Sequence, residues 1–212
     1  MKKIIVLILI LLLVMSGYWY YKKNNTVPVD PNISSYRNTN LGISFKYPKI
    51  LTTKGNNASI NIHHEVPFTH HDFCDFKGEA TTTINTLTDF NVTMHLVSKN
   101  LVDSMKTESP YIPEENFVNN TIVPSPGFIE EVNFGNLKGY SIFEGAEGCG
   151  HVIYYLSVSD NKTLVIINDF ITIFSGAIDI ENMERALAVP GVINRQMAEE
   201  IFKSIVKTVQ IQ

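Results

Sequence analysis

Hydrophobic and polar residues alternate along much of the chain beyond residue 36, a pattern that predicts β-strands with one buried face. The expected strands cover residues 43–47, 59–66, 131–134, 139–144, 152–159 and 163–170. Asp160 and Asn161 separate the last two strands and form a good turn sequence, so these strands are expected to make a hairpin.

Helical spacing of apolar residues appears in fewer places. Ser98 can cap a short helix, and a second helix is expected to end before Pro190. The clearest helix covers about residues 195–207 after the cap candidate Asn194, because its apolar positions form one stripe. A closing strand, residues 208–211, follows. Hairpins with helices between and after them predict an α+β fold whose sheet is largely antiparallel.

The first 23 residues differ from the rest. Residues 4–21 carry no charge, and as a helix they would extend roughly 27 Å, close to the thickness of a bilayer's hydrocarbon core. Lysines precede this stretch, its last four residues, 18–21, are aromatic, and two lysines follow at 22–23, as is typical of membrane interfaces. We expect one N-terminal transmembrane helix, a signal anchor over residues 1–23. A cleaved signal peptide is the alternative, since the strictly apolar residues 4–15 have the length of one.

A polar, proline-containing stretch separates this anchor from the strands. Residues 24–35 are expected to be a linker, and residues 36–212 a single domain. The absence of a second apolar span, together with the two cysteines of the domain, favours a single-pass protein of the cell membrane with an extracytoplasmic C-terminal domain.

Length and charge restrict the classes of function. A chain of 212 residues has room for one ordinary domain and a short appendage. Four of the 17 basic residues lie within residues 1–23, so 13 basic and 21 acidic residues remain, a net charge of −8. This charge argues against nucleic acid as a partner, because binding to the phosphate backbone needs clustered lysine and arginine.

Short segments at the two ends of the domain carry a resemblance to a known family. Residues 36–38 (YRN) and 41–48 (LGISFKYP) are similar to the opening of PsbP-like domains, the family of the photosystem II extrinsic subunit. Residues 201–205 (IFKSI) and the strand 208–211 resemble the closing helix and strand of such domains. The resemblance implies an α/β/α sandwich in a membrane-anchored bacterial protein. It implies no photosystem function, because no metal or docking residue of that subunit has a match here.

The chain has two cysteines, Cys74 and Cys149, both in the part expected to lie outside the membrane. Oxidising compartments favour disulfides, so we predict that these two form one. Two buried free thiols are one alternative. The other is a reactive Cys149 with His151 as its base, since residues two apart in a strand share a face.

Four of the six histidines fall within residues 63–71, the densest group of metal-ligating side chains in the chain. A disulfide from Cys74 to Cys149 would bring His70, His71 and Asp72 near His151, a set that Zn(II) or Cu(II) accepts. Two alternatives remain: histidines that only make local hydrogen bonds, with His64 half-buried, and a loop that gains charge near pH 6.

No sequence motif for nucleotide binding, a nucleophile elbow or a zinc protease occurs in the chain. No catalytic residues are therefore assigned and no cofactor is required. The sequence favours a binding or assembly accessory domain, held at the membrane by its N-terminal helix, with a protein or a small molecule as its partner. The alternative function is a metal-binding surface protein that uses the histidine cluster.

Overall fold

The computed structural model describes residues 31–71, 74, 83–146, 149–174 and 180–212. The chain divides into two compact units, Met1–Ile33 and Ser34–Gln212, and the fold described below is that of the second. The predicted transmembrane helix, residues 1–23, lies outside the described residues. Within the described ranges, no helix is long and apolar enough to cross a membrane.

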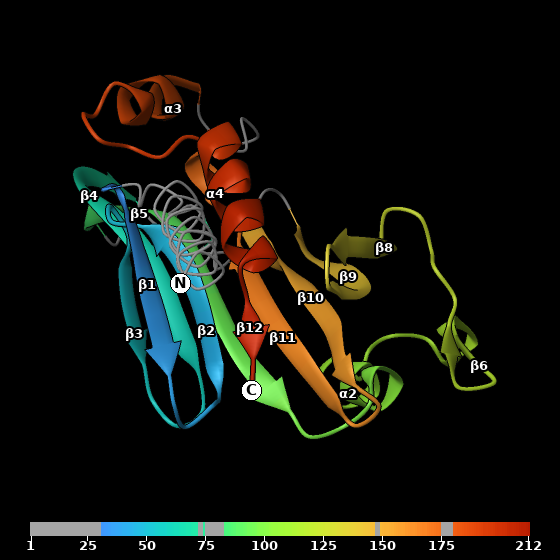
Figure 1. The fold of residues 1–212 in the computed structure, drawn as a ribbon. Coiled ribbons are helices and arrows are strands. Elements are labelled where there is room, and N and C mark those ends of the chain that lie inside the picture. Colours follow the sequence, from blue (N-terminus) through green and yellow to red (C-terminus); the bar gives the residue numbers. More distant parts are fainter. Residues whose placement is uncertain (1–30, 72–73, 75–82, 147–148, 175–179) are drawn as a thin grey trace, which may run out of the picture. The chain divides into compact units, whose positions relative to one another are not determined.

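The largest element is a seven-stranded sheet in which every neighbouring pair is antiparallel (Figure 1). Its strands, in spatial order, are β3 (Thr52–Gly55), β4 (Ile60–His71), β5 (Thr83–Val97), β11 (Lys162–Asp169), β10 (Cys149–Ser159), β9 (Leu137–Ala146) and β8 (Ile129–Phe134). The prediction of an α+β protein with a largely antiparallel sheet is confirmed.

Two smaller sheets complete the β structure. Strands β1 (Ile33–Asn38), β2 (Ile43–Pro48) and β12 (Gln210–Ile211) form one, and β1 begins inside the segment expected to be a linker. Strands β6 (Phe117–Val118) and β7 (Thr121–Ile122) form a separate hairpin. Asn119 and Asn120 make its two-residue turn with positive φ angles, a conformation that asparagine tolerates better than most residues.

Three α-helices lie among the described residues: α2 (Leu101–Glu108), α3 (Ile180–Leu187) and α4 (Arg195–Lys207). Asn100 caps α2 in place of the expected Ser98, since its side chain accepts a hydrogen bond from the Asp103 amide. Asn194 caps α4 as predicted, accepting from the Met197 amide at 2.9 Å. Single turns of 3-10 helix occur at Glu114–Asn116 and Thr172–Phe174.

Helices α4 and α2 pack on opposite faces of the large sheet. Leu156 of β10 belongs to the same buried cluster as Phe202 of α4, together with residues of β2. Its neighbour Tyr155 belongs to a second cluster with Met105 of α2. Adjacent residues of a strand point to opposite faces, so the two helices cover the two sides of β10. The surface beside α4, over strands β8 to β11, is where a cavity opens.

Candidate functional site

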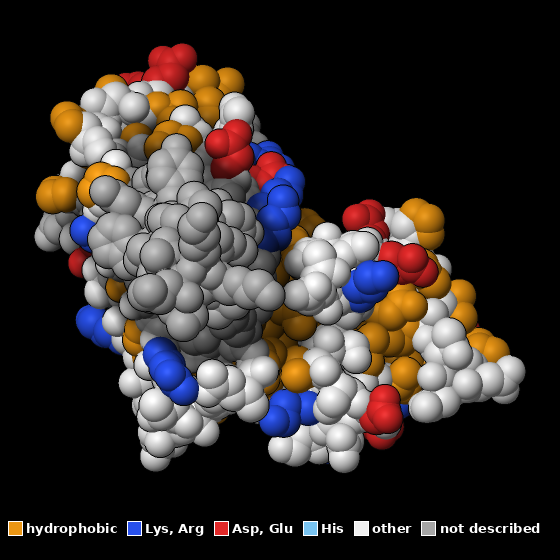
Figure 2. Space-filling view, viewed as in Figure 1, with side chains coloured by type: hydrophobic (Ala, Val, Ile, Leu, Met, Phe, Trp, Pro, Cys, Tyr) orange, Lys and Arg blue, Asp and Glu red, His pale blue; other side chains and the backbone are white. Residues whose placement is uncertain are grey.

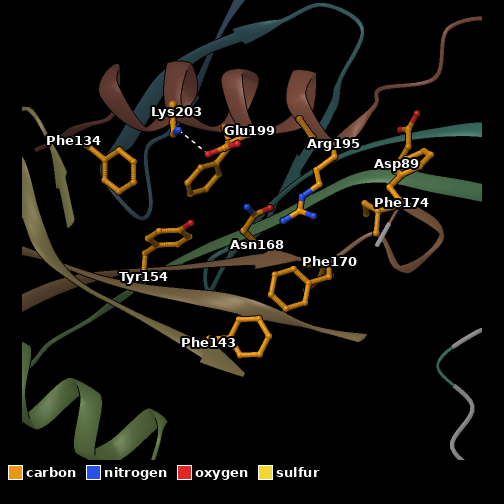
Figure 3. A pocket seen from close by; sticks show the side chains of 14 residues that line it. Asp89, Phe134, Phe143, Tyr154, Asn168, Phe170, Phe174, Arg195, Glu199 and Lys203 are labelled. Atoms are coloured by element: carbon orange, nitrogen blue, oxygen red, sulfur yellow. Dashed lines mark hydrogen bonds and ion pairs between the residues drawn. The ribbon is translucent and has the colours of Figure 1, made fainter. Parts of the chain in front are cut away.

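A cavity of about 390 Å³ lies between α4 and strands β8 to β11. This volume is toward the small end of the range of small-molecule sites, about 300–1,000 Å³. We call it the aromatic pocket. Its walls are Asp89, Phe134, Phe143, Tyr154, Asn168, Asp169, Phe170, Ile171, Phe174, Arg195, Ala198, Glu199, Phe202 and Lys203 (Figure 3).

Three aromatic rings form the inner wall of the aromatic pocket. The Tyr154 and Phe202 rings lie 4.8 Å apart between centroids, and the Phe134 ring meets both edge-on at 5.7 and 5.9 Å. Such contacts hold aromatic rings in fixed orientations, each pair contributing about 0.5–1.5 kcal/mol beyond the area it buries. The inner wall is therefore a rigid apolar surface.

A second aromatic pair stands where the pocket meets solvent. The Phe143 and Phe170 rings are 5.1 Å apart, and 48% of Phe143 is exposed. Figure 2 shows hydrophobic side chains at the surface between α4 and the β8–β9 side of the sheet, with lysine and arginine side chains next to α4. Large exposed aromatic side chains at a cavity mouth are typical of binding sites rather than of bare protein surface.

Polar groups enter the pocket mainly from α4. Lys203 Nζ donates to Glu199 Oε1 at 2.7 Å, and this hydrogen bond lowers the pKa of Glu199. From the sheet, Asn168 and Tyr154 project into the same space, where burial raises the pKa of Tyr154 and the Asn168 side chain opposes that shift. Arg195, the first residue of α4, extends its guanidinium toward Asn168 (Figure 3).

A buried carboxylate fixes the start of α4, and with it the position of these side chains. Asp89 of β5 is completely buried, and its Oδ2 accepts a hydrogen bond from the Ile193 backbone N–H at 2.7 Å. Its Oδ1 lies 2.6 Å from Nδ1 of His64, whose side chain is 16% exposed. His64 is thus a half-buried, hydrogen-bonded residue, in agreement with the structural interpretation of the histidines.

The predicted disulfide between Cys74 and Cys149 is confirmed, with Cα atoms 5.7 Å apart. Both sulfurs are consumed in this bond, so the two alternatives, a pair of free thiols and a reactive Cys149, are wrong. Thr172 Oγ1 lies 2.9 Å from Cys74 Sγ and 3.6 Å from Cys149 Sγ. The disulfide therefore abuts the segment 170–174 that carries the outer wall of the aromatic pocket.

His70 makes local contacts with backbone atoms. Its Nδ1 lies 2.7 Å from the His71 carbonyl oxygen and its Nε2 3.2 Å from that of Thr86. The ring also stacks on Phe68, with centroids 5.8 Å apart. Both ring nitrogens thus lie within hydrogen-bonding distance of β4 and β5 backbone carbonyls.

His151 lies between two carboxylates on the α2 face of the large sheet. Its Nε2 is 2.9 Å from Glu144 Oε2 and its Nδ1 is 3.9 Å from Asp169 Oδ1. Asp72, the remaining member of the predicted metal set, lies outside the described residues. Over the part of the chain that is described, no three His, Cys, Asp or Glu side chains form a group suited to a metal ion. The zinc or copper site over all four residues stays a prediction.

Sequence reasoning missed the aromatic pocket. It identified the apolar stripe of α4 but not the adjoining face with Arg195, Ala198 and Glu199, and it did not connect Phe143 with Phe170. The available signal was a series of aromatic residues in or just after the late strands: Phe134, Phe143, Tyr154 and Phe170. Strand register was needed to show that these residues share one face, because a shift of one residue moves a side chain to the other side.

Comparisons with known proteins leave the function open. No protein-family model and no curated protein matches the chain. A solved structure from Bacteroides thetaiotaomicron VPI-5482 is similar at a TM-score of 0.41 and 8% identity over 84% of this chain. The matched region is 48% of that structure, so the chain spans about half of its length. A likeness this weak carries no inference about function.

Proposed function

We propose that this protein is a membrane-anchored, extracytoplasmic binding domain that holds a small ligand in the aromatic pocket. The observation that carries the proposal is the pocket itself: a cavity of about 390 Å³ with rigid aromatic walls and a few polar side chains. Apolar walls supply affinity, and a small number of placed polar groups supply orientation and specificity. This is the composition of a ligand site rather than of a packing defect.

The lining favours binding over catalysis. Among the described residues that line the aromatic pocket there is no cysteine, serine, threonine or histidine, the side chains that most often act as nucleophiles and proton carriers. Glu199 is already paired with Lys203, and Asp89 is committed to the start of α4. A binding or assembly accessory role therefore fits this lining better than a hydrolytic one.

The location rests on the sequence, with one supporting observation from the fold. An apolar stretch at residues 4–21 and a polar linker precede the domain. The disulfide supports an oxidising compartment on the outer side of the membrane, since cytosolic thiols are kept reduced. We also infer that the domain is a PsbP-like α/β/α sandwich, an inference supported by helices on both faces of β10.

The binding role is tested by blocking the pocket. The full chain, held in lipid nanodiscs, is screened by ligand-observed NMR against a diverse set of small aromatic and apolar compounds. Ala198→Phe would place a ring in the cavity from α4, whereas Glu200→Phe puts the same ring on an exposed position two residues along. Compounds that bind wild type and Glu200→Phe but not Ala198→Phe are the expected result. An identical binding profile for all three proteins would contradict the proposal.

The location is tested in cells that produce the full chain with a C-terminal tag. The anchor hypothesis expects the tag in the membrane fraction and accessible to protease added outside intact cells. Removal of residues 1–23 should release the domain from the membrane. A tag that is protected in intact cells, or a mature protein that begins after residue 17, would contradict the anchor with its C-terminal domain outside.

A further inference from the structure

Arg195 differs from the other charged residues of the aromatic pocket. Lys203 and Glu199 neutralise each other at 2.7 Å, and Asp89 is held by the Ile193 amide and His64. Among the described residues, none forms a hydrogen bond or a close ion pair with the Arg195 guanidinium. Its charge acts on Glu199 only as the smallest contribution to that carboxyl's lowered pKa.

The fifth charged residue of the lining, Asp169, does not balance Arg195. Asp169 lies opposite His151 in the β10–β11 pairing, and its carboxylate contacts His151 and Asn91 on the α2 side of the sheet. Asn168, the preceding residue, is the one that points into the pocket (Figure 3). The pocket therefore contains one positive charge that no described acidic side chain neutralises at close range.

The position of Arg195 defines where a negative group would sit. Figure 3 shows its guanidinium pointing from α4 toward Asn168 and Phe170, with the Tyr154 ring beyond Asn168 and the Phe143 ring beyond Phe170. A guanidinium presents two parallel N–H donors that match the two oxygens of a carboxylate. The neighbouring Asn168 amide adds a neutral donor and acceptor. A flat apolar group attached to that carboxylate would lie against the aromatic walls.

The geometry points to a ligand that joins a flat hydrophobic ring to a carboxylate through a short link, an assignment that rests on the proposed binding function. A ligand of higher negative charge, such as a phosphate monoester, would leave charge unneutralised, because Lys203 is already bound to Glu199. A neutral ring compound would leave the guanidinium without its best partner. A free arylalkanoic acid and the C-terminal aromatic residue of a peptide share the required chemistry.

The assignment is tested by calorimetry on the full chain in nanodiscs with matched acids and amides. The probes are 3-phenylpropionate and its amide, and N-acetyl-glycyl-phenylalanine and its C-terminal amide. Each acid should bind at least about 10-fold more tightly than its amide, because a charge-assisted bidentate pair is lost in the amide. Tighter binding of the peptide acid identifies a peptide C-terminus as the source, and tighter binding of 3-phenylpropionate identifies a free acid.

Variants separate charge from shape. Arg195→Gln should abolish the preference for acids. Arg195→Lys should retain part of it, because lysine keeps the charge but lacks the two parallel N–H donors of the guanidinium. Arg185→Gln is the matched control, since Arg185 lies on α3 near Phe68, away from the pocket lining, and it should leave the preference intact. Phe143→Ala should weaken the binding of acids and amides to a similar extent, because it removes part of the pocket wall and no charge.

Two results would overturn the carboxylate assignment. Equal binding of acids and amides to wild type is one, and an acid preference that survives Arg195→Gln is the other. If none of these probes binds while the screen still finds compounds blocked by Ala198→Phe, the ligand class is wrong and the binding function stands. If neither experiment finds a ligand, the proposed function fails as well.

Discussion

Asp89 offers the sharpest test of how the pocket is built. Asp89 lies on β5 and is completely buried. Its carboxylate contacts one group more than 100 residues away in the sequence and one on the neighbouring strand. One carboxylate oxygen accepts from the Ile193 backbone N–H at 2.7 Å, just before α4, and the other faces His64 on β4 at 2.6 Å. Removal of the carboxylate would leave both of these groups without their acceptor.

The size of the effect follows from these two contacts. A hydrogen bond to a charged group contributes about 1.5–3 kcal/mol, and the Asp89 carboxylate makes two such contacts, with the Ile193 N–H and with His64. Asp89→Ala should therefore lower the free energy of unfolding by about 3–5 kcal/mol. Asp89→Asn keeps the shape and one acceptor oxygen, so its loss should be smaller, about 1–3 kcal/mol.

The assay is urea unfolding of residues 31–212, which contain the compact unit and all residues involved, followed by circular dichroism. Asp160→Asn, in the exposed hairpin turn, is the matched control and should change stability by no more than about 0.5 kcal/mol. Asp89→Ala should also weaken ligand binding, because the start of α4 carries Arg195. The role given to this carboxylate would be refuted if Asp89→Ala lowered the free energy of unfolding by less than about 1 kcal/mol, or by no more than Asp160→Asn does.

Three further predictions concern the rest of the domain. Replacement of both Cys74 and Cys149 by serine should lower stability by roughly 4 kcal/mol, because the loop between them has a sequence separation of 75 residues; an unchanged melting temperature with and without reductant would contradict this. Tyr155→Phe should cost about 1 kcal/mol in urea unfolding, since it removes the buried tyrosine hydroxyl that lies 2.8 Å from the Ser109 hydroxyl; no measurable change would argue against that hydrogen bond. The pKa of Glu199 is lowered by Lys203, so the small stabilisation from this pair is present above the ordinary glutamate pKa and lost as pH falls through the lowered value. An NMR titration should show the lowered pKa in wild type and an ordinary one in Lys203→Gln; equal values would contradict the pairing.

The strands that sequence analysis predicted are those with unbroken alternation. The expected strands at 152–159 and 163–170 correspond to β10 and β11, with the turn at Asp160 and Asn161. Strand β4 extends to His71, beyond the expected end at residue 66, because it continues past irregularities in its pairing with β5. Such irregularities interrupt the period-two signal without ending the strand.

Strand β5 (Thr83–Val97), the longest strand among the described residues, was missed although its second half alternates from Phe90 to Leu96. Its neighbours in the sheet are β4 and β11, and β11 lies about 70 residues further along the chain. Its place inside the sheet, between two other strands, depends on the pairing with β11, which is distant in sequence. Local pattern alone does not reveal such pairings.

The cysteine pair illustrates what the sequence by itself determined. With two cysteines and an expected oxidising location, only one intramolecular disulfide was available, and the structure forms it. The antiparallel α+β character, the cap of α4 at Asn194 and the hairpin at Asp160 also follow from residues close together in the chain. These features depend on the local conformation of neighbouring residues and on the number of cysteines, both of which a sequence shows directly.

Tertiary structure alone decided the aromatic pocket. Its walls come from β5, β8, β9, β10, β11, the segment after β11 and α4, and they meet only because strand register places Tyr154, Asn168 and Phe143 on the face that α4 partly covers. Cross-strand pairing also determined the surroundings of the predicted metal ligand His151, since it placed this residue beside Glu144 and Asp169. Which side chains face one another is set by pairings between distant residues, and no local pattern encodes those distances.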